Sequence, residues 1–206
     1  MCVNKQTSLI SFIIGIVVSI YMYCYEKNST LKMIALCWIW VTFMQLFEYF
    51  IWSNQTCNNT NKHSTKLAFL FNITQPIVVF LLLMNITNSS KYLASTIIFI
   101  YIMLILYFLN TSDYNCLIKN KNCSGLTYKW WTDFKYGGLL YVCTLITIIL
   151  LLVKPIKLAI IIASYILISL LISMFIYSCN VASMWCLLVI SFPIFLMIIN
   201  KVWLKL

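Results

Sequence analysis

The sequence predicts an all-α protein: a single domain over residues 1–206, built as a polytopic bundle of seven transmembrane helices. Of the 206 residues, 63% are hydrophobic and only 9% are charged. A soluble domain has about 45–50% apolar and about 25% charged residues. The apolar residues gather in runs of about 20, the length that a helix needs to cross a bilayer core about 30 Å thick. This composition excludes an ordinary soluble enzyme, a disordered tail and a coiled coil.

Seven apolar runs qualify as spans, and each is bounded by Lys, Asn or Pro. Backbone groups exposed to lipid must satisfy their own hydrogen bonds, so these runs are predicted to be helices. Membrane strands would need alternating segments of about ten residues, and the sequence does not show them. The predicted spans are residues 8–25, 33–52, 67–86, 92–109, 136–153, 156–177 and 181–200.

Local sequence features define two of the span boundaries and predict one bend. The first run follows Lys5, as in a signal peptide, but it is long and ends in Tyr21-Met22-Tyr23-Cys24-Tyr25 instead of small residues. We therefore expect an uncleaved helix. The division between the fifth and sixth spans depends on the two-lysine turn at residues 154–157. Pro193 is expected to bend the seventh span, because proline removes a helical hydrogen bond.

An odd number of spans places the two termini on opposite faces. Face A holds the N-terminus and the loops at residues 53–66, 110–135 and 178–180, and face B holds the C-terminus and the other three loops. Each face carries seven lysines, but those of face B lie in shorter segments, which weigh most in the positive-inside rule. We therefore expect the N-terminus outside or in a lumen and the C-terminus in the cytosol.

The cysteines favour the same orientation, since disulfides persist in oxidising compartments. Those at or near face A are Cys2, Cys57, Cys116, Cys123 and Cys179. Within the long loop, Cys116 and Cys123 are predicted to form a disulfide that staples it. Free thiols remain the alternative, because pairing cannot be deduced from sequence alone.

The formal net charge of +10 is the balance of 14 lysines against four acidic residues, and the lysines lie at the edges of the apolar runs. Lysines in such places anchor helix ends at the headgroups. A nucleic-acid surface would instead show clustered Lys and Arg, and Arg is absent. The predicted partners are the lipid bilayer and other membrane proteins, and no nucleic acid is expected.

Glu48 is the one clear ionisable residue inside a predicted span, and such residues are functional hypotheses by default. Helical spacing puts Gln45 and Glu48 on one face of the second span. The third span starts from the same side of the membrane and carries Asn72 and Gln75. Pro76 also frees the carbonyl of Asn72. These polar groups form a candidate ligand site, and the alternative is that they only fix helix packing.

Trp185 opens the seventh span on the same face, in Ser183-Met184-Trp185-Cys186, and it completes the candidate site. Cys57 and His63 lack the further ligands that a zinc site needs, so no metal is expected. The seventh span has no lysine at mid-membrane for retinal, and the chain has no Gly-rich phosphate loop, so no cofactor is expected. No nucleophile–base pair supports an enzyme.

Four short segments resemble motifs of an uncharacterised family of multi-pass membrane proteins from giant DNA viruses and protists. They are residues 43–52, residues 74–77, Lys129-Trp130-Trp131 and Ser183-Met184-Trp185-Cys186. The third segment departs from the family's pattern, because no His precedes its tryptophans. The resemblance implies a viral membrane protein of about seven helices, and it implies no established activity.

Two functions remain open. The first is a structural or interaction protein of a viral or organelle membrane. The alternative is binding or transport of a small solute or ion through the polar cluster around Glu48. The two hypotheses differ in geometry: a binding protein is expected to have Glu48 lining a cavity with Asn72, Gln75 and Trp185, and a scaffold is expected to have Glu48 packed shut.

Overall fold

A computed structural model describes residues 4–86, 90–109, 116–119, 126, 137–176 and 181–204 of the chain. Its regular elements over these residues are all helical, which confirms the predicted all-α class. The helices are α1 (Lys5–Tyr25), α2 (Ser29–Ser53), α3 (Asn59–Ile73), α4 (Gln75–Met84), α5 (Lys91–Leu109), α7 (Gly137–Leu152), α8 (Ile156–Ile176), α9 (Val181–Ile190) and α10 (Phe192–Ile199), followed by a π-helical turn (Asn200–Leu204).

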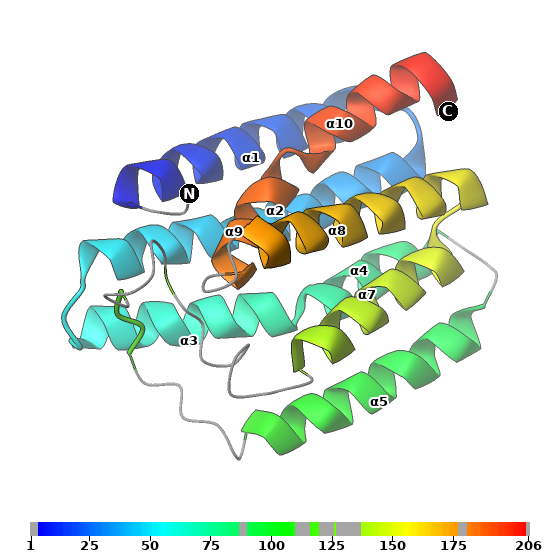
Figure 1. Ribbon diagram of the computed structural model, residues 1–206. Coiled ribbons are helices and arrows are strands. Elements are labelled where there is room, and N and C mark those ends of the chain that lie inside the picture. The colour runs from blue at the N-terminus through cyan, green and yellow to red at the C-terminus, as the bar shows by residue number, and fades with distance from the viewer. Residues whose placement is uncertain are drawn as a thin grey trace.

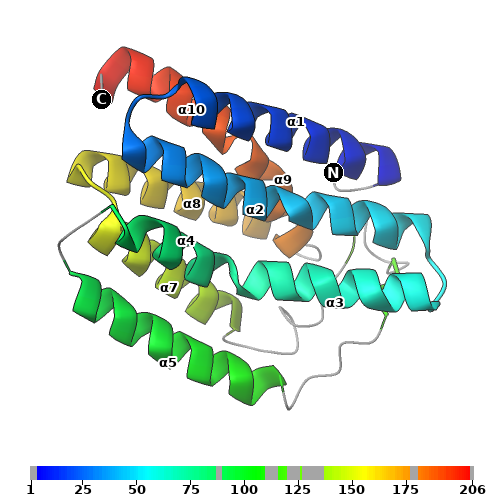
Figure 2. The same cartoon turned by 180° about the vertical axis from the view of Figure 1, so that it is seen from behind.

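The long helices lie side by side along one direction (Figure 1). α1 and α10 form one edge of the bundle and α5 forms the opposite edge, as both views show (Figure 2). α2 packs against α1, α3 and α4, and α9 packs between α2 and α8. The N-terminal end of α1 and the C-terminal end of the π-helical turn lie at opposite ends of the bundle.

Each predicted span corresponds to one helix or to one interrupted pair of helices. The segments long and apolar enough to cross a membrane are Lys5–Tyr25, Ser29–Ser53, Ile156–Ile176 and Met184–Val202. The pair α3 and α4 qualifies only as one unit, and it is bent by 44°. The apolar parts of α5 and α7 are shorter than the other spans. The structure therefore supports four or five crossings, and the count of seven stays a prediction.

Asparagine side chains cap α1, α2 and α3, and each of these helices begins earlier than the sequence predicted. Asn28 Oδ1 accepts hydrogen bonds from the backbone N–H groups of Thr30 and Leu31, at 2.9 and 3.2 Å, so α2 begins at Ser29 instead of residue 33. Asn58 Oδ1 accepts a bond of 2.9 Å from the N–H of Asn61, so α3 begins well before residue 67. Asparagine at this position satisfies N–H groups that the first helical turn leaves open.

Prolines accompany both helix breaks. Pro76 follows the break at Thr74 between α3 and α4, and Pro193 follows the break at Ser191 between α9 and α10. A proline removes one N–H from the helical ladder, and the carbonyl four residues earlier needs another donor. At the position where Pro193 was predicted to bend the seventh span, the helix is interrupted at Ser191.

α1 packs closely on α2 because its contact face is made of small residues. The buried positions Ser8, Ser11, Gly15 and Ser19 recur every three or four residues. A Cβ atom built on Gly15 would lie 2.6 Å from Thr42 Cγ2. Small residues at such spacing allow helix backbones to approach closely, as is common between membrane helices.

Candidate functional site

A cavity of about 40 Å³ lies inside the bundle, between α2, α4, α7, α8 and α9. Its walls are mostly apolar, and they run from Gln75, Tyr141 and Trp185 at one end to Ile34 and Val153 at the other. A site needs about 10–15 Å³ to hold one water molecule, so the cavity has room for about three waters or for a solute of a few heavy atoms. The polar groups are concentrated at one end of it.

Four buried side chains from four helices form a connected row across that end. The hydroxyl of Tyr141 in α7 donates a hydrogen bond to Gln75 Oε1 in α4. The ring of Tyr141 meets the ring of Trp185 edge-on, with centroids 5.8 Å apart and planes at 85°. Trp185 Nε1 then donates a bond of 2.9 Å to Ser169 Oγ in α8. The row therefore joins α4, α7, α9 and α8 at the polar end of the cavity.

The amide of Gln75 keeps bonding capacity that the described part of the chain does not use. Only 4% of this residue is exposed, and its Nε2 atom has no hydrogen-bond partner among the described residues. The two amide ends are assigned from the network, so exchanging them would leave the oxygen unbonded instead. A buried polar group without a partner costs about 1–3 kcal/mol. A hydrogen-bonding group inside the cavity would remove this cost.

The other predicted site residues do not line the cavity. Gln45 and Glu48 have no exposed surface and Asn72 has 3%. Each of the three has a bonding or electrostatic partner within the protein. Glu48 lies close enough to Cys186, a residue of the cavity wall, for the two to interact electrostatically. The predicted cluster is therefore divided: Gln75 and Trp185 line the cavity, and the other three are buried without lining it.

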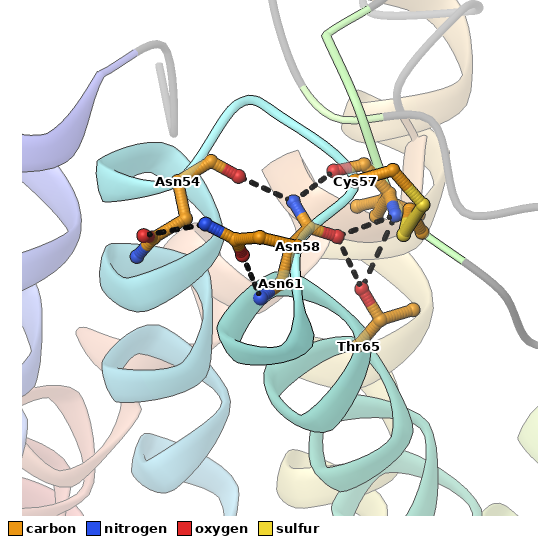
Figure 3. The surroundings of a disulfide bond; sticks show 7 residues. Asn54, Cys57, Asn58, Asn61 and Thr65 are labelled. Atoms are coloured by element: carbon orange, nitrogen blue, oxygen red, sulfur yellow. Dashed lines mark hydrogen bonds between the residues drawn. A yellow bond between two sulfur atoms is a disulfide. The ribbon is translucent and has the colours of Figure 1, made fainter.

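At the face A end of the bundle, Cys57 and Cys116 form a disulfide with Cα atoms 5.4 Å apart (Figure 3). The prediction that Cys116 pairs with Cys123 is therefore wrong, because Cys116 is bonded to Cys57. Cys123 lies outside the described residues. The sequence did not reveal that the turn between α2 and α3 lies beside residues 116–119. The aromatic segment at residues 129–131 also lies outside the described residues.

Asn61 holds the same two segments together without a covalent bond. Its side chain has no exposed surface, and it pairs with both the N–H and the carbonyl of the Leu117 backbone. Oδ1 accepts from the Leu117 N–H at 3.0 Å, and Nδ2 donates to the Leu117 carbonyl at 2.9 Å. Nδ2 also donates to the carbonyl of Asn54 at 2.6 Å (Figure 3). The side chain of Leu117 is thereby held in a cluster with Ile51 of α2.

Sequence reasoning missed Tyr141 and Ser169. Tyr141 lies five residues into the predicted span 136–153, deeper than a tyrosine of the interfacial belt needs to be, and this depth was a usable signal. Ser169 gave no signal, because isolated serines are common in apolar helices. No group of three or more His, Cys, Asp or Glu residues that could hold a metal occurs within the ranges that the structure describes.

Comparison of the chain with protein-family models, with curated proteins and with solved structures found no match.

Proposed function

We propose that the protein is a seven-span integral membrane protein that binds a small neutral solute in its central cavity. The observation that carries this proposal is the polar end made by Gln75 and Tyr141 on an otherwise apolar cavity. Ligand sites typically combine an apolar lining with a few polar groups that orient the ligand. Here Gln75 supplies that polar group.

The lining argues for a neutral solute with one hydrogen-bonding group. The residues that line the cavity include no Asp, Glu, Lys, Arg or His among those described. Moving an unpaired charge into an apolar site costs far more than one hydrogen bond returns. An ion or a strongly polar metabolite is therefore a poor fit, and a short alcohol or amide is a good one.

The seven-span topology is supported by the arrangement of the short helices. α5 and α7 run beside the longer helices in both views (Figures 1 and 2). A hydrophobic stretch shorter than the bilayer is accommodated by local thinning at modest cost. The disulfide Cys57–Cys116 lies at the face A end, and this favours an outer or lumenal position for that end.

A structural role in a viral or organelle membrane is the second candidate. Glu48 is fully buried and does not line the cavity, which is the geometry expected of a scaffold, so this observation favours the structural role and the proposed binding site is built around Gln75 instead. The resemblance to membrane proteins of giant DNA viruses supports the viral setting. The two roles are compatible, because a scaffold can also hold a small molecule.

The test uses the full chain in lipid nanodiscs with n-butanol as the probe. A ligand that binds only the folded state raises the unfolding midpoint, and the stabilisation grows with the logarithm of the ligand concentration above Kd. We expect n-butanol to stabilise the wild-type protein relative to Gln75→Leu. Tyr141→Phe is the second variant, since it removes only the hydroxyl. Ile14→Leu, on the exposed side of α1, is the matched control and should respond as the wild type does. Equal responses of the wild type, Gln75→Leu and Tyr141→Phe would overturn the proposal.

A further inference from the structure

A groove of about 460 Å³ runs along the outer side of α8, where α8 meets α9 and α10. Its walls are apolar except for Ser164, Tyr165 and Ser169, all from α8. This volume falls within the range of about 300–1,000 Å³ that is typical of ligand pockets. The groove opens on α8, one of the helices long and apolar enough to cross a membrane. In the proposed topology it therefore faces hydrocarbon.

Only one layer of side chains separates the groove from the central cavity. Ser169 lines the groove and Trp185 lines the cavity, and the hydrogen bond of 2.9 Å between them crosses the wall. Neighbouring residues of α9 also face the two spaces: Leu188 lines the groove and Val189 lines the cavity. Joining the two spaces would require the Trp185 side chain to leave its hydrogen bond with Ser169.

A second contact holds this wall closed beside the break in the seventh span. The hydroxyl of Tyr165 donates to the carbonyl of Leu188 at 3.0 Å and lies 2.6 Å from Ser191 Oγ. Ser191 separates α9 from α10. α9 is thus a short helix tied to α8 by two side-chain contacts, one from Trp185 and one from Tyr165.

We propose that the cavity and the groove together form the site of a neutral single-chain amphiphile that enters sideways from the bilayer. Its hydroxyl headgroup bonds to Gln75 beside Tyr141, and its hydrocarbon tail passes between Trp185 and Ser169 into the groove. This inference rests on the proposed binding function and names its ligand class. No Asp, Glu, Lys, Arg or His is among the described residues that line either space, so a charged headgroup is excluded by the same desolvation cost.

The experiment uses the full chain in phosphatidylcholine vesicles and a long-chain alcohol with a diazirine at the end of its tail. After irradiation, mass spectrometry maps the labelled residues. We expect labelling of α8 and α10 at the groove, and we expect excess unlabelled alcohol to suppress it. A phosphatidylcholine with the same diazirine chain is the matched probe, and it should label the exposed face of α1 without saturation. Groove labelling by the alcohol that does not saturate would overturn the inference.

Two variants test the wall and the groove separately. Ser169→Ala removes the acceptor of Trp185, and a lost hydrogen bond of about 1 kcal/mol predicts an increase of about fivefold in competable labelling of Ile168 and Ile172 in the groove, where the end of the tail lies. Ser164→Trp fills the groove from an exposed position and should abolish competable labelling. Ile13→Trp, on the exposed face of α1, is its control. Unchanged groove labelling in Ser169→Ala, or competable labelling retained in Ser164→Trp, would contradict the inference.

The two proposals fail in different ways. If n-butanol still stabilises the wild type over Gln75→Leu while alcohol labelling is not saturable, only the amphiphile inference falls. If labelling is saturable but n-butanol gives no difference, the headgroup position at Gln75 is wrong and the proposed function falls with it.

Discussion

The indole N–H of Trp38 donates a hydrogen bond of 2.8 Å to the carbonyl of Val189. This carbonyl lies four residues before Pro193, so it is the one that the proline leaves without its helical donor. The ring of Trp38 also packs on Phe192, with centroids 4.3 Å apart. A side chain of α2 thereby stabilises the break in the seventh span, at the wall of the central cavity.

This relationship predicts a non-additive effect of two substitutions. Trp38→Phe should lower the free energy of unfolding by about 1–2 kcal/mol, because the buried carbonyl of Val189 loses its donor. In the background of Pro193→Ala the cost should be smaller, since the new N–H can bond to Val189. The wild type, the two single variants and the double variant form a double-mutant cycle. SDS titration in mild-detergent micelles measures the free energy of unfolding of each. Equal costs of Trp38→Phe in both backgrounds would show that Trp38 acts only by packing.

A similar contact occurs at the other helix break. The hydroxyl of Tyr101 in α5 donates a bond of 2.8 Å to the carbonyl of Ile73, next to Thr74. The sequence predicted that Pro76 would disturb the third span, but it did not reveal the donor. Backbone at a break inside an apolar bundle has to find such partners, and in both spans a distant aromatic residue provides them.

Gly15 should be intolerant of any side chain. Gly15→Ala places a methyl group 2.6 Å from Thr42 Cγ2 and 2.7 Å from Thr42 Oγ1, which forces α1 away from α2. We expect a loss of about 1–3 kcal/mol in the free energy of unfolding, the usual cost of overpacking. Adding Thr42→Ala removes both clashing atoms and should restore part of the loss. Val17→Ala, at an exposed position of α1, is the control. A Gly15→Ala protein as stable as the wild type would contradict the close packing of α1 on α2.

The disulfide predicts a specific result in peptide mapping. Digestion without reduction should yield one fragment that joins Cys57 to Cys116, and a fragment joining Cys116 to Cys123 would contradict the structure. Because 59 residues separate the two half-cystines, Cys57→Ser should lower the free energy of unfolding by about 2–4 kcal/mol. Cys143→Ser, which removes an exposed free thiol, should change it little.

Glu48→Gln should leave the response to n-butanol unchanged. The substitution keeps the shape of the side chain, and Glu48 does not line the cavity. Thermal unfolding in nanodiscs with and without n-butanol measures this, beside Gln75→Leu as the variant that loses the response. A folded Glu48→Gln protein without the response would place Glu48 in the ligand site, as the sequence first suggested.

The sequence was sufficient to locate the apolar helices and insufficient to show how they meet. Runs of about 20 apolar residues between Lys, Asn and Pro located the apolar helices among the described residues, because burial in an apolar environment requires a closed hydrogen-bond ladder, but they missed the polar first half of α3. The early starts of α2 and α3 depend on caps at Asn28 and Asn58, and asparagine is too frequent in this chain for a cap to stand out.

The sequence predicted only some of the site residues, because it shows polar residues within apolar runs but not which helices are neighbours. Gln75 and Trp185 were recognised as polar groups within apolar runs, and both line the cavity. Their partners Tyr141 and Ser169 come from other helices, and one sequence contains no information on which helices are neighbours. The pairing of Cys116 with Cys57 was missed in the same way, since the sequence favoured the nearer Cys123.

The central claim is that a neutral molecule occupies the cavity and bonds to Gln75. Native mass spectrometry of the protein released from nanodiscs, prepared from cell membranes without detergent washing, tests it most directly. We expect the wild type and Ile14→Leu to carry a bound adduct of constant mass, and we expect Gln75→Leu and Tyr141→Phe to lose it. A wild-type protein without an adduct, or one that all four proteins retain equally, would contradict the claim.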